Sequence, residues 1–153
     1  MSIDIATMTG VIKSTAQASG VVAVALHHEP KSAPQLNGQI TFAFWFNRMA
    51  PVQSSGLNSV SIRLEYQGRL YASALTEPAD AIDPTLLSAA DTLMGLYCGD
   101  FELGGTARHI DIYGQHGEPL SVTGSYITQD SKIYRAFEFL IPIIVNDVWT
   151  VAP

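Results

Sequence analysis

The apolar positions near the start of the chain recur first with the period of a helix and then with that of a strand. Ile5, Met8 and Ile12 are spaced by three and four residues, as on one face of a helix. We therefore predict a helix over Ser2–Ser19. The valine-rich residues that follow predict a strand over Val21–Leu26.

A strongly apolar and aromatic run predicts a second strand over Gln39–Asn47. Phe42 and Phe44 fall on one face of this strand and Trp45 on the other, so both faces are expected to be covered. The next segment, Arg48–Ser59, is rich in proline, serine, glycine and asparagine and predicts an extended loop. A loop of this length is often functional.

Alternating apolar and polar residues predict a third strand over Val60–Tyr71. Ile62 and Leu64 point to one face of this strand. Arg63 and Glu65 point to the opposite face.

A second helix has clear start and stop signals. Asp83 is a good N-cap, and Pro84 suits the first helical position because its missing N–H has no partner there. Leu86 and Leu93 follow helical spacing, and Gly99 is placed to end the helix.

Three further strands are predicted in the C-terminal third of the chain. The first covers Ala107–Tyr113, with Asp111 pointing outward. A turn over Gly114–Pro119 leads to a strand over Leu120–Thr128. A tight hairpin connection then leads to the last strand, Lys132–Leu140.

The order of elements is therefore helix, three strands, helix, three strands. This order predicts an α+β fold with a mixed, largely antiparallel sheet and two helices packed on one face. The chain has no internal repeat and no convincing linker, so residues 1–153 are expected to form a single domain.

The composition indicates a domain that assembles with partners rather than a solitary domain. Charged residues make up 14% of the 153 residues, against roughly 25% in an average globular protein. Hydrophobic residues reach 47%. Such a surface favours burial against a partner, although a monomer solvated by uncharged polar residues is the alternative. We interpret the chain as a self-assembling structural subunit rather than an enzyme.

Charge and hydropathy exclude several classes of partner. The net charge of −6 argues against a sequence-reading nucleic-acid binder, which needs basic residues to neutralise phosphates. The longest apolar runs, Ile40–Phe46 and Phe139–Val145, fall far short of the roughly 20 residues of a membrane-spanning helix. Because Cys98 is the only cysteine, no internal disulfide is possible and a reducing compartment is expected.

Candidate chemistry is sparse, and we expect no catalytic, cofactor-binding or metal-ligating residues. The cluster His27, His28 and Glu29 is the one that resembles metal ligands. Adjacent residues on a strand point to opposite faces, so solvated histidines are favoured over a metal site. A small metal- or ligand-binding enzyme that uses His27, His28 and His109 stays as the alternative from a different class.

Contact residues are expected where interface-prone residues fall on predicted loops. Arg and Met are enriched at protein interfaces, and here they open the long loop. The turn Gly114–Pro119 and the apolar run Ile141–Pro153 are further expected contact segments. The candidate interface residues are Asn47, Arg48, Met49, Pro51, His116 and Trp149.

Three phrases in the C-terminal half of the chain, within Leu75–Pro153, carry a resemblance to a known family. They are Glu77–Pro84, Gly99–Gly105 and Leu140–Trp149. Together they resemble tail-terminator and head-to-tail connector proteins of long-tailed actinobacteriophages. The predicted element order is also similar to the tail-terminator fold.

The resemblance implies a structural virion protein at the head–tail junction, assembled in the host cytoplasm. It implies a homohexameric ring that caps the tail tube, stops its polymerisation and offers a docking surface for the head connector. The expected partners are further copies of the chain, the tail tube protein and the head-closure protein. DNA would pass through the acidic lumen without sequence-specific binding. Another junction role, head closure or tail tube, stays open.

Overall fold

The computed structural model describes residues 3–30, 39–55, 58–73 and 79–151. The order helix, three strands, helix, three strands is confirmed, with one short 3-10 helix before the second α-helix. The elements are α1 Ile5–Ala18, β1 Val24–Leu26, β2 Thr41–Ser55, β3 Ser59–Ser73, η1 Ala79–Ala81, α2 Ile82–Gly99, β4 His109–Ile110, β5 Ser121–Gln129 and β6 Lys132–Thr150.

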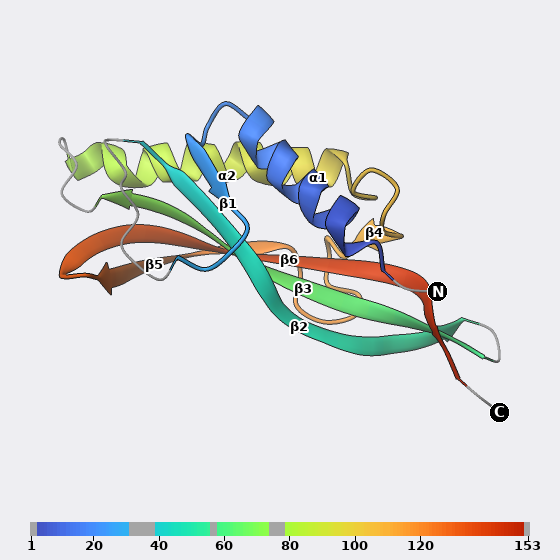
Figure 1. Cartoon of the computed structure of the whole chain (residues 1–153). Coiled ribbons are helices and arrows are strands. Elements are labelled where there is room, and N and C mark those ends of the chain that lie inside the picture. The colour runs from blue at the N-terminus through green and yellow to red at the C-terminus, as the bar shows by residue number, and fades with distance from the viewer. Residues whose placement is uncertain (1–2, 31–38, 56–57, 74–78, 152–153) are drawn as a thin grey trace.

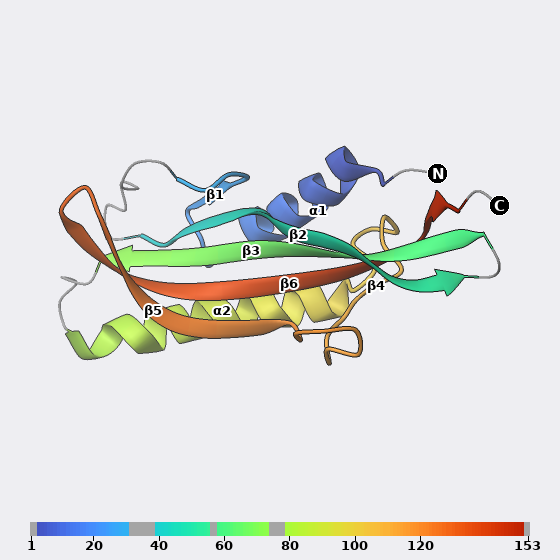
Figure 2. The ribbon, with the colours of Figure 1, turned by 90° about the horizontal axis from the view of Figure 1, so that it is seen from below.

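All the described strands belong to one curled sheet with the order β1-β2-β3-β6-β4 (Figure 2). β5 also pairs with β6, along Lys132–Leu140, and β4 pairs further along the same strand, at Ile143 and Ile144. The β1–β2 pair is parallel and every other pair is antiparallel. The predicted α+β class, with its mixed and largely antiparallel sheet, is confirmed.

Both helices cover the same face of the sheet, as predicted (Figure 1). Met8 and Ile12 of α1 and Leu93 of α2 are fully buried against this face. The buried hydroxyl of Tyr97 on α2 donates a hydrogen bond of 3.0 Å to the carbonyl of Ile12, which ties the two helices together. Burial raises the pKa of this tyrosine.

Aromatic rings pack closely at the centre of the sheet. Phe42, on β2, and Phe139, on β6, lie on either side of Gly68 on β3, and their ring centroids are 5.7 Å apart. A Cβ atom at Gly68 would lie 3.0 Å from the Phe42 ring and 3.1 Å from the Cβ of Phe139. The glycine is therefore required by packing.

The prediction of a loop over Arg48–Ser59 is wrong for residues 48–55, which form a strand, and residues 56–57 of that range lie outside the described residues. β2 continues to Ser55 and pairs with β3 along almost its whole length. The proline at position 51 is tolerated because β1 covers only the Thr41–Ala43 part of β2, and edge strands accept proline. Register shifts at Phe46/Arg48 and at Pro51/Gln53 bend this edge.

The predicted strand Ala107–Tyr113 is shorter in the structure, where only His109 and Ile110 pair with β6. Asp111 ends this pairing. The prediction that its side chain points outward is wrong, because only 1% of the residue is exposed.

The start of the second helix also differs from the prediction. α2 begins at Ile82, and its N-cap residue, Ala81, makes no side-chain capping bond. Asp83 instead accepts a hydrogen bond of 2.8 Å from Arg135 on β6. Pro84 still lies in the first turn, where backbone N–H groups have no helical partner.

The last strand is much longer than predicted, because β6 runs on to Thr150. Its residues Ile141, Ile143 and Ile144 are buried, so the proposed contact segment Ile141–Pro153 begins inside the fold. The start of this run is covered on both faces of the sheet, so it lacks the alternation of apolar and polar residues by which a strand is predicted.

The three longest strands project beyond the helices as an arm (Figure 1). We define the arm as residues 51–55 of β2, 59–62 of β3 and 145–150 of β6, which are joined at the register Pro51–Ile62–Val145. β6 contains a bulge near the base of the arm, where Asp147 has a positive φ of 54°. The bulge bends β6 within the arm.

Candidate interface

A buried ion cluster lies on the face of the sheet opposite the helices. The side chains of Arg63 and Glu65 on β3 meet that of Asp111, which follows β4. The guanidinium donates to Glu65 over 2.9 Å and to Asp111 over 2.5 Å, and it also donates to the carbonyl of Glu118. Arg63 is only 3% exposed, so its charge is compensated almost entirely by protein groups.

The cluster organises the turn after β4. One carboxylate oxygen of Asp111 accepts from the backbone N–H of Gln115 over 2.8 Å, and the other accepts from that of His116 over 3.0 Å. Gly117 packs so closely on the guanidinium that a Cβ atom there would lie 3.0 Å from Cζ of Arg63. Arg63 thereby fixes the turn 111–119 against the sheet.

The environment of Asp111 favours its charged form. Burial acts to raise the pKa of this carboxyl, but the N–H donors of His116 and Gln115 and the charge of Arg63 outweigh it. The pKa of Asp111 is therefore lowered from its ordinary value.

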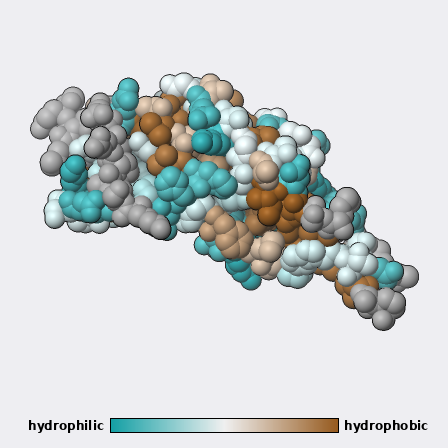
Figure 3. Space-filling view, viewed as in Figure 1, coloured by the Kyte–Doolittle hydropathy of each residue, from teal (hydrophilic) through white to brown (hydrophobic). Residues whose placement is uncertain are grey.

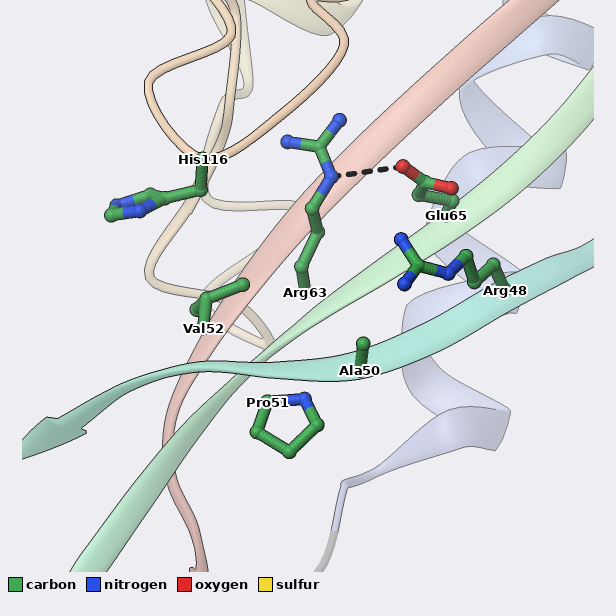
Figure 4. A pocket seen from close by; sticks show the side chains of 7 residues that line it. All are labelled: Arg48, Ala50, Pro51, Val52, Arg63, Glu65 and His116. Atoms are coloured by element: carbon green, nitrogen blue, oxygen red, sulfur yellow. Dashed lines mark hydrogen bonds and ion pairs between the residues drawn. The ribbon is translucent and has the colours of Figure 1, made fainter.

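An open hollow of about 350 Å³ lies beside the cluster (Figure 4). Arg63 and Glu65 are among its lining residues, and Arg48 extends from β2 beneath Glu65, its partner across the strand pair. The ring of His116 points away from Arg63. The hollow is lined by Arg48, Ala50, Pro51, Val52, Arg63, Glu65 and His116.

Three of the six candidate interface residues, Arg48, Pro51 and His116, meet in this hollow although they come from β2 and from the turn after β4. Asn47 lines a neighbouring hollow of about 280 Å³ that shares Glu65. The charged and polar candidates therefore gather on the helix-free face.

The other two candidates lie elsewhere. Met49 pairs with Leu64, whose side chain belongs to the helix-side core, so Met49 projects from the opposite face to the hollow. Trp149 pairs with Val60 near the end of the arm. Both side chains are more than one-third exposed.

Two large apolar side chains are exposed on β2, beyond the part that β1 covers. Phe46 is 55% exposed and Met49 is 43% exposed. Figure 3 shows apolar surface gathered below α1, where β2 crosses the view. These side chains give the edge the character of a contact surface.

The buried ion cluster was missed at the level of sequence. Arg63 and Glu65 were correctly placed on one face of a strand, but their distance from Asp111 along the chain hid the third member. The available signal was a pair of opposite charges two residues apart on a strand whose other face is apolar.

The histidines do not form a metal centre in the described residues. His27 stacks on Phe44 with ring centroids 4.7 Å apart, and burial, with smaller contributions from Lys13 and His28, lowers its pKa. Within the described ranges, no three histidine, cysteine, aspartate or glutamate side chains come together in a way that could hold a metal ion. None of the helices there is both long and apolar enough to span a bilayer.

No protein-family model matches the chain, and no curated protein matches it in sequence.

Proposed function

We propose that this protein is a tail terminator of a long-tailed bacteriophage. It forms a ring that caps the tail tube, stops its polymerisation and provides the docking surface for the head connector. Its place is the head–tail junction of the virion, after assembly in the host cytoplasm, and it performs no catalysis. Its partners are further copies of itself, the tail tube protein and the head-closure protein.

The projecting arm is the observation that carries the proposal. A solitary domain has little reason to extend three strands beyond its helices, since the extension adds surface and little core. Trp149 and Val151 remain exposed at its end, which is typical of a segment that packs against a neighbouring subunit.

The composition and the sequence phrases support the same proposal. The low charge content favours a surface that is covered in an assembly. The resemblance of Glu77–Pro84, Gly99–Gly105 and Leu140–Trp149 to tail-terminator proteins supports the specific role. A net charge of −6 suits a ring through which DNA passes without being retained.

Two different ends are what a terminator needs. The helix-covered body and the arm differ in chemistry, and such a subunit can bind the last ring of the tube with one end and the head connector with the other. A tube subunit also needs two different but complementary faces, because each ring must bind the next one. The choice of a terminator over a tube subunit therefore rests on the resemblance of the sequence phrases.

The proposal is tested by imaging particles made without this protein. We expect tails of uncontrolled length that are not joined to heads, with normal particles restored when the wild-type protein is supplied. Normal-length tails joined to heads in its absence would rule out the terminator role. Normal-length tails that remain detached would indicate head closure instead, and a complete lack of tails would indicate a tube subunit.

The alternative of a metal-binding enzyme has its own test. Metal analysis of the purified protein, repeated with alanine at His27, His28 or His109, would support that alternative if a stoichiometric metal were found and then lost on substitution.

A further inference from the structure

Two chemically different surfaces lie on opposite edges of the sheet. β1 and β2 form one long edge, and β4 and β5 form the other (Figure 2). Each edge carries exposed aromatic or apolar side chains close to exposed charges. We call the surface on the first edge the β2 patch and the surface on the second edge the β4 hollow.

The β2 patch consists of Phe46, Arg48 and Met49. Phe46 and Met49 pair with Tyr66 and Leu64, so their side chains leave the sheet on the helix side. Arg48 is exposed, leaves on the other side, and forms no ion pair within the described ranges. The edge therefore presents two apolar side chains and one available cation.

The β4 hollow has a largely apolar lining, and the exposed carboxylate of Glu102 follows one of its lining residues in the sequence. Its volume is about 250 Å³, and it is lined by Phe101, His109, Ile110, Asp111, Ile112, Tyr113 and Gln115. The Tyr113 side chain stands at its mouth with 87% of the residue exposed. Phe101 is itself exposed and is flanked in the sequence by Asp100 and Glu102.

We propose that the β2 patch of one copy of this chain binds the β4 hollow of a second copy. Phe46 and Met49 pack against Phe101 and Tyr113, and Arg48 faces Glu102, which follows Phe101 in the chain. The place of this contact in a ring rests on the proposed function. The inference adds to that function the two surfaces through which neighbouring copies meet.

A second copy is the occupant favoured by complementarity. The patch offers flexible apolar side chains and a cation, and the second surface offers an apolar recess with the exposed carboxylate of Glu102 beside it. Both surfaces belong to the same chain and lie on opposite edges, so each copy has one of each. A contact of this kind is heterologous and repeats from copy to copy, closing into a ring when the rotation is right.

Side-chain docking, rather than continuation of the sheet, is the expected mode of contact. Register shifts at Phe46/Arg48 and at Pro51/Gln53 interrupt the outer edge of β2. Bulged edges are poor templates for a further strand. Methionine and aromatic side chains are well suited to fill a recess without strand pairing.

Site-directed crosslinking tests the geometry. Met49→Cys protein and Tyr113→Cys protein, both in a Cys98→Ser background, are mixed at high concentration and oxidised. We expect a mixed disulfide dimer that forms only when both proteins are present. The matched control replaces Tyr113→Cys by Leu87→Cys, since Leu87 is also highly exposed but lies on α2 away from both surfaces.

Self-association tests the energetics. Met49→Asp should weaken self-association of the full chain by at least about tenfold in sedimentation analysis, because a buried interface anchor contributes more than about 1.4 kcal/mol. Leu87→Asp should leave association unchanged. Met49 is exposed in a single copy, so both variants should keep the wild-type circular dichroism spectrum.

Three outcomes would overturn the inference: no mixed dimer, equal crosslinking to position 87, or preferential pairing of position 49 with itself. The result is separable from that of the proposed function. Crosslinking of positions 49 and 113 in a protein that is dispensable for tail length would keep this contact and remove the terminator role. If tail length is uncontrolled in the absence of the protein but positions 49 and 113 do not crosslink, the terminator role is kept and this contact is ruled out.

Discussion

Leu64 and Arg63 are neighbours on β3, and both side chains are almost completely buried, but opposite kinds of chemistry bury them. Leu64 faces the helices and packs among apolar side chains. Arg63 faces the turn 111–119 and is held by Glu65, Asp111 and a backbone carbonyl. One strand thus separates an apolar core from an ionic one.

The two faces differ in what they specify. Apolar packing stabilises the fold but tolerates substitutions that conserve volume. An ionic cluster tolerates much less, because the loss of one member leaves its partner charged and buried. The apolar face accordingly supports the helices, and the ionic face fixes one turn at one position beside the base of the arm.

The largest effect is expected from Arg63→Ala. The substitution leaves Asp111 and Glu65 without their cation, and we expect a loss of about 3–5 kcal/mol in the free energy of unfolding. Urea denaturation followed by circular dichroism measures this loss. Arg48→Ala is the matched control, because Arg48 is exposed and its removal should change stability by no more than about 0.5 kcal/mol.

A neutral triple variant sharpens the same test. Arg63→Met combined with Glu65→Gln and Asp111→Asn removes every charge of the cluster at once, and we expect it to be more stable than Arg63→Ala. If Arg63→Ala were as stable as the wild type, the ionic face would have no structural role.

A smaller effect is expected on the apolar face from Gly68→Ala. The new methyl group would press on the rings of Phe42 and on Phe139, and overpacking of this kind costs about 1–3 kcal/mol. Gly95→Ala is the control, because no atom lies within 4 Å of its Cβ position on α2. That variant should be neutral or up to about 1 kcal/mol more stable, owing to helix propensity. Equal effects of the two substitutions would contradict the packing argument.

The smallest effect is expected from titration of Asp111. Because the pKa of this carboxyl is lowered in the folded state, its contribution to stability is present above the ordinary value of about 4 and is lost as the pH falls through the lowered value. Unfolding midpoints of wild type and Asp111→Asn should therefore differ at about pH 6 and converge towards about pH 2. A difference that stayed constant over this range would show that Asp111 does not titrate in this way.

Most of the fold could be predicted from local patterns. The spacing of Ile5, Met8 and Ile12 predicted α1, and the alternation along β3 predicted its two faces. The predicted loop Arg48–Ser59 failed over residues 48–55 because proline and serine are taken as loop residues, whereas an uncovered edge strand also accepts them.

The candidate interface was only partly accessible to sequence reasoning. Arg48, Pro51 and His116 were selected separately, and the fold brings them together through strand pairing that no local pattern encodes. Asp111 was misplaced because a carboxylate on a predicted strand is assigned to solvent by default. Its burial depends on Arg63, which lies 48 residues earlier in the chain.

The central position of β6 has a consequence for how the chain folds. β3, β4 and β5 all pair with this strand, and all of them precede it in the sequence. During synthesis, the β2–β3 hairpin can form early, but β4 and β5 have no strand to pair with until β6 leaves the ribosome. Pairing of β6 with β3 also closes long loops, which slows folding. The sheet is therefore completed late, from its middle, and the edge of β3 that pairs with β6 stays uncovered in the nascent chain until then.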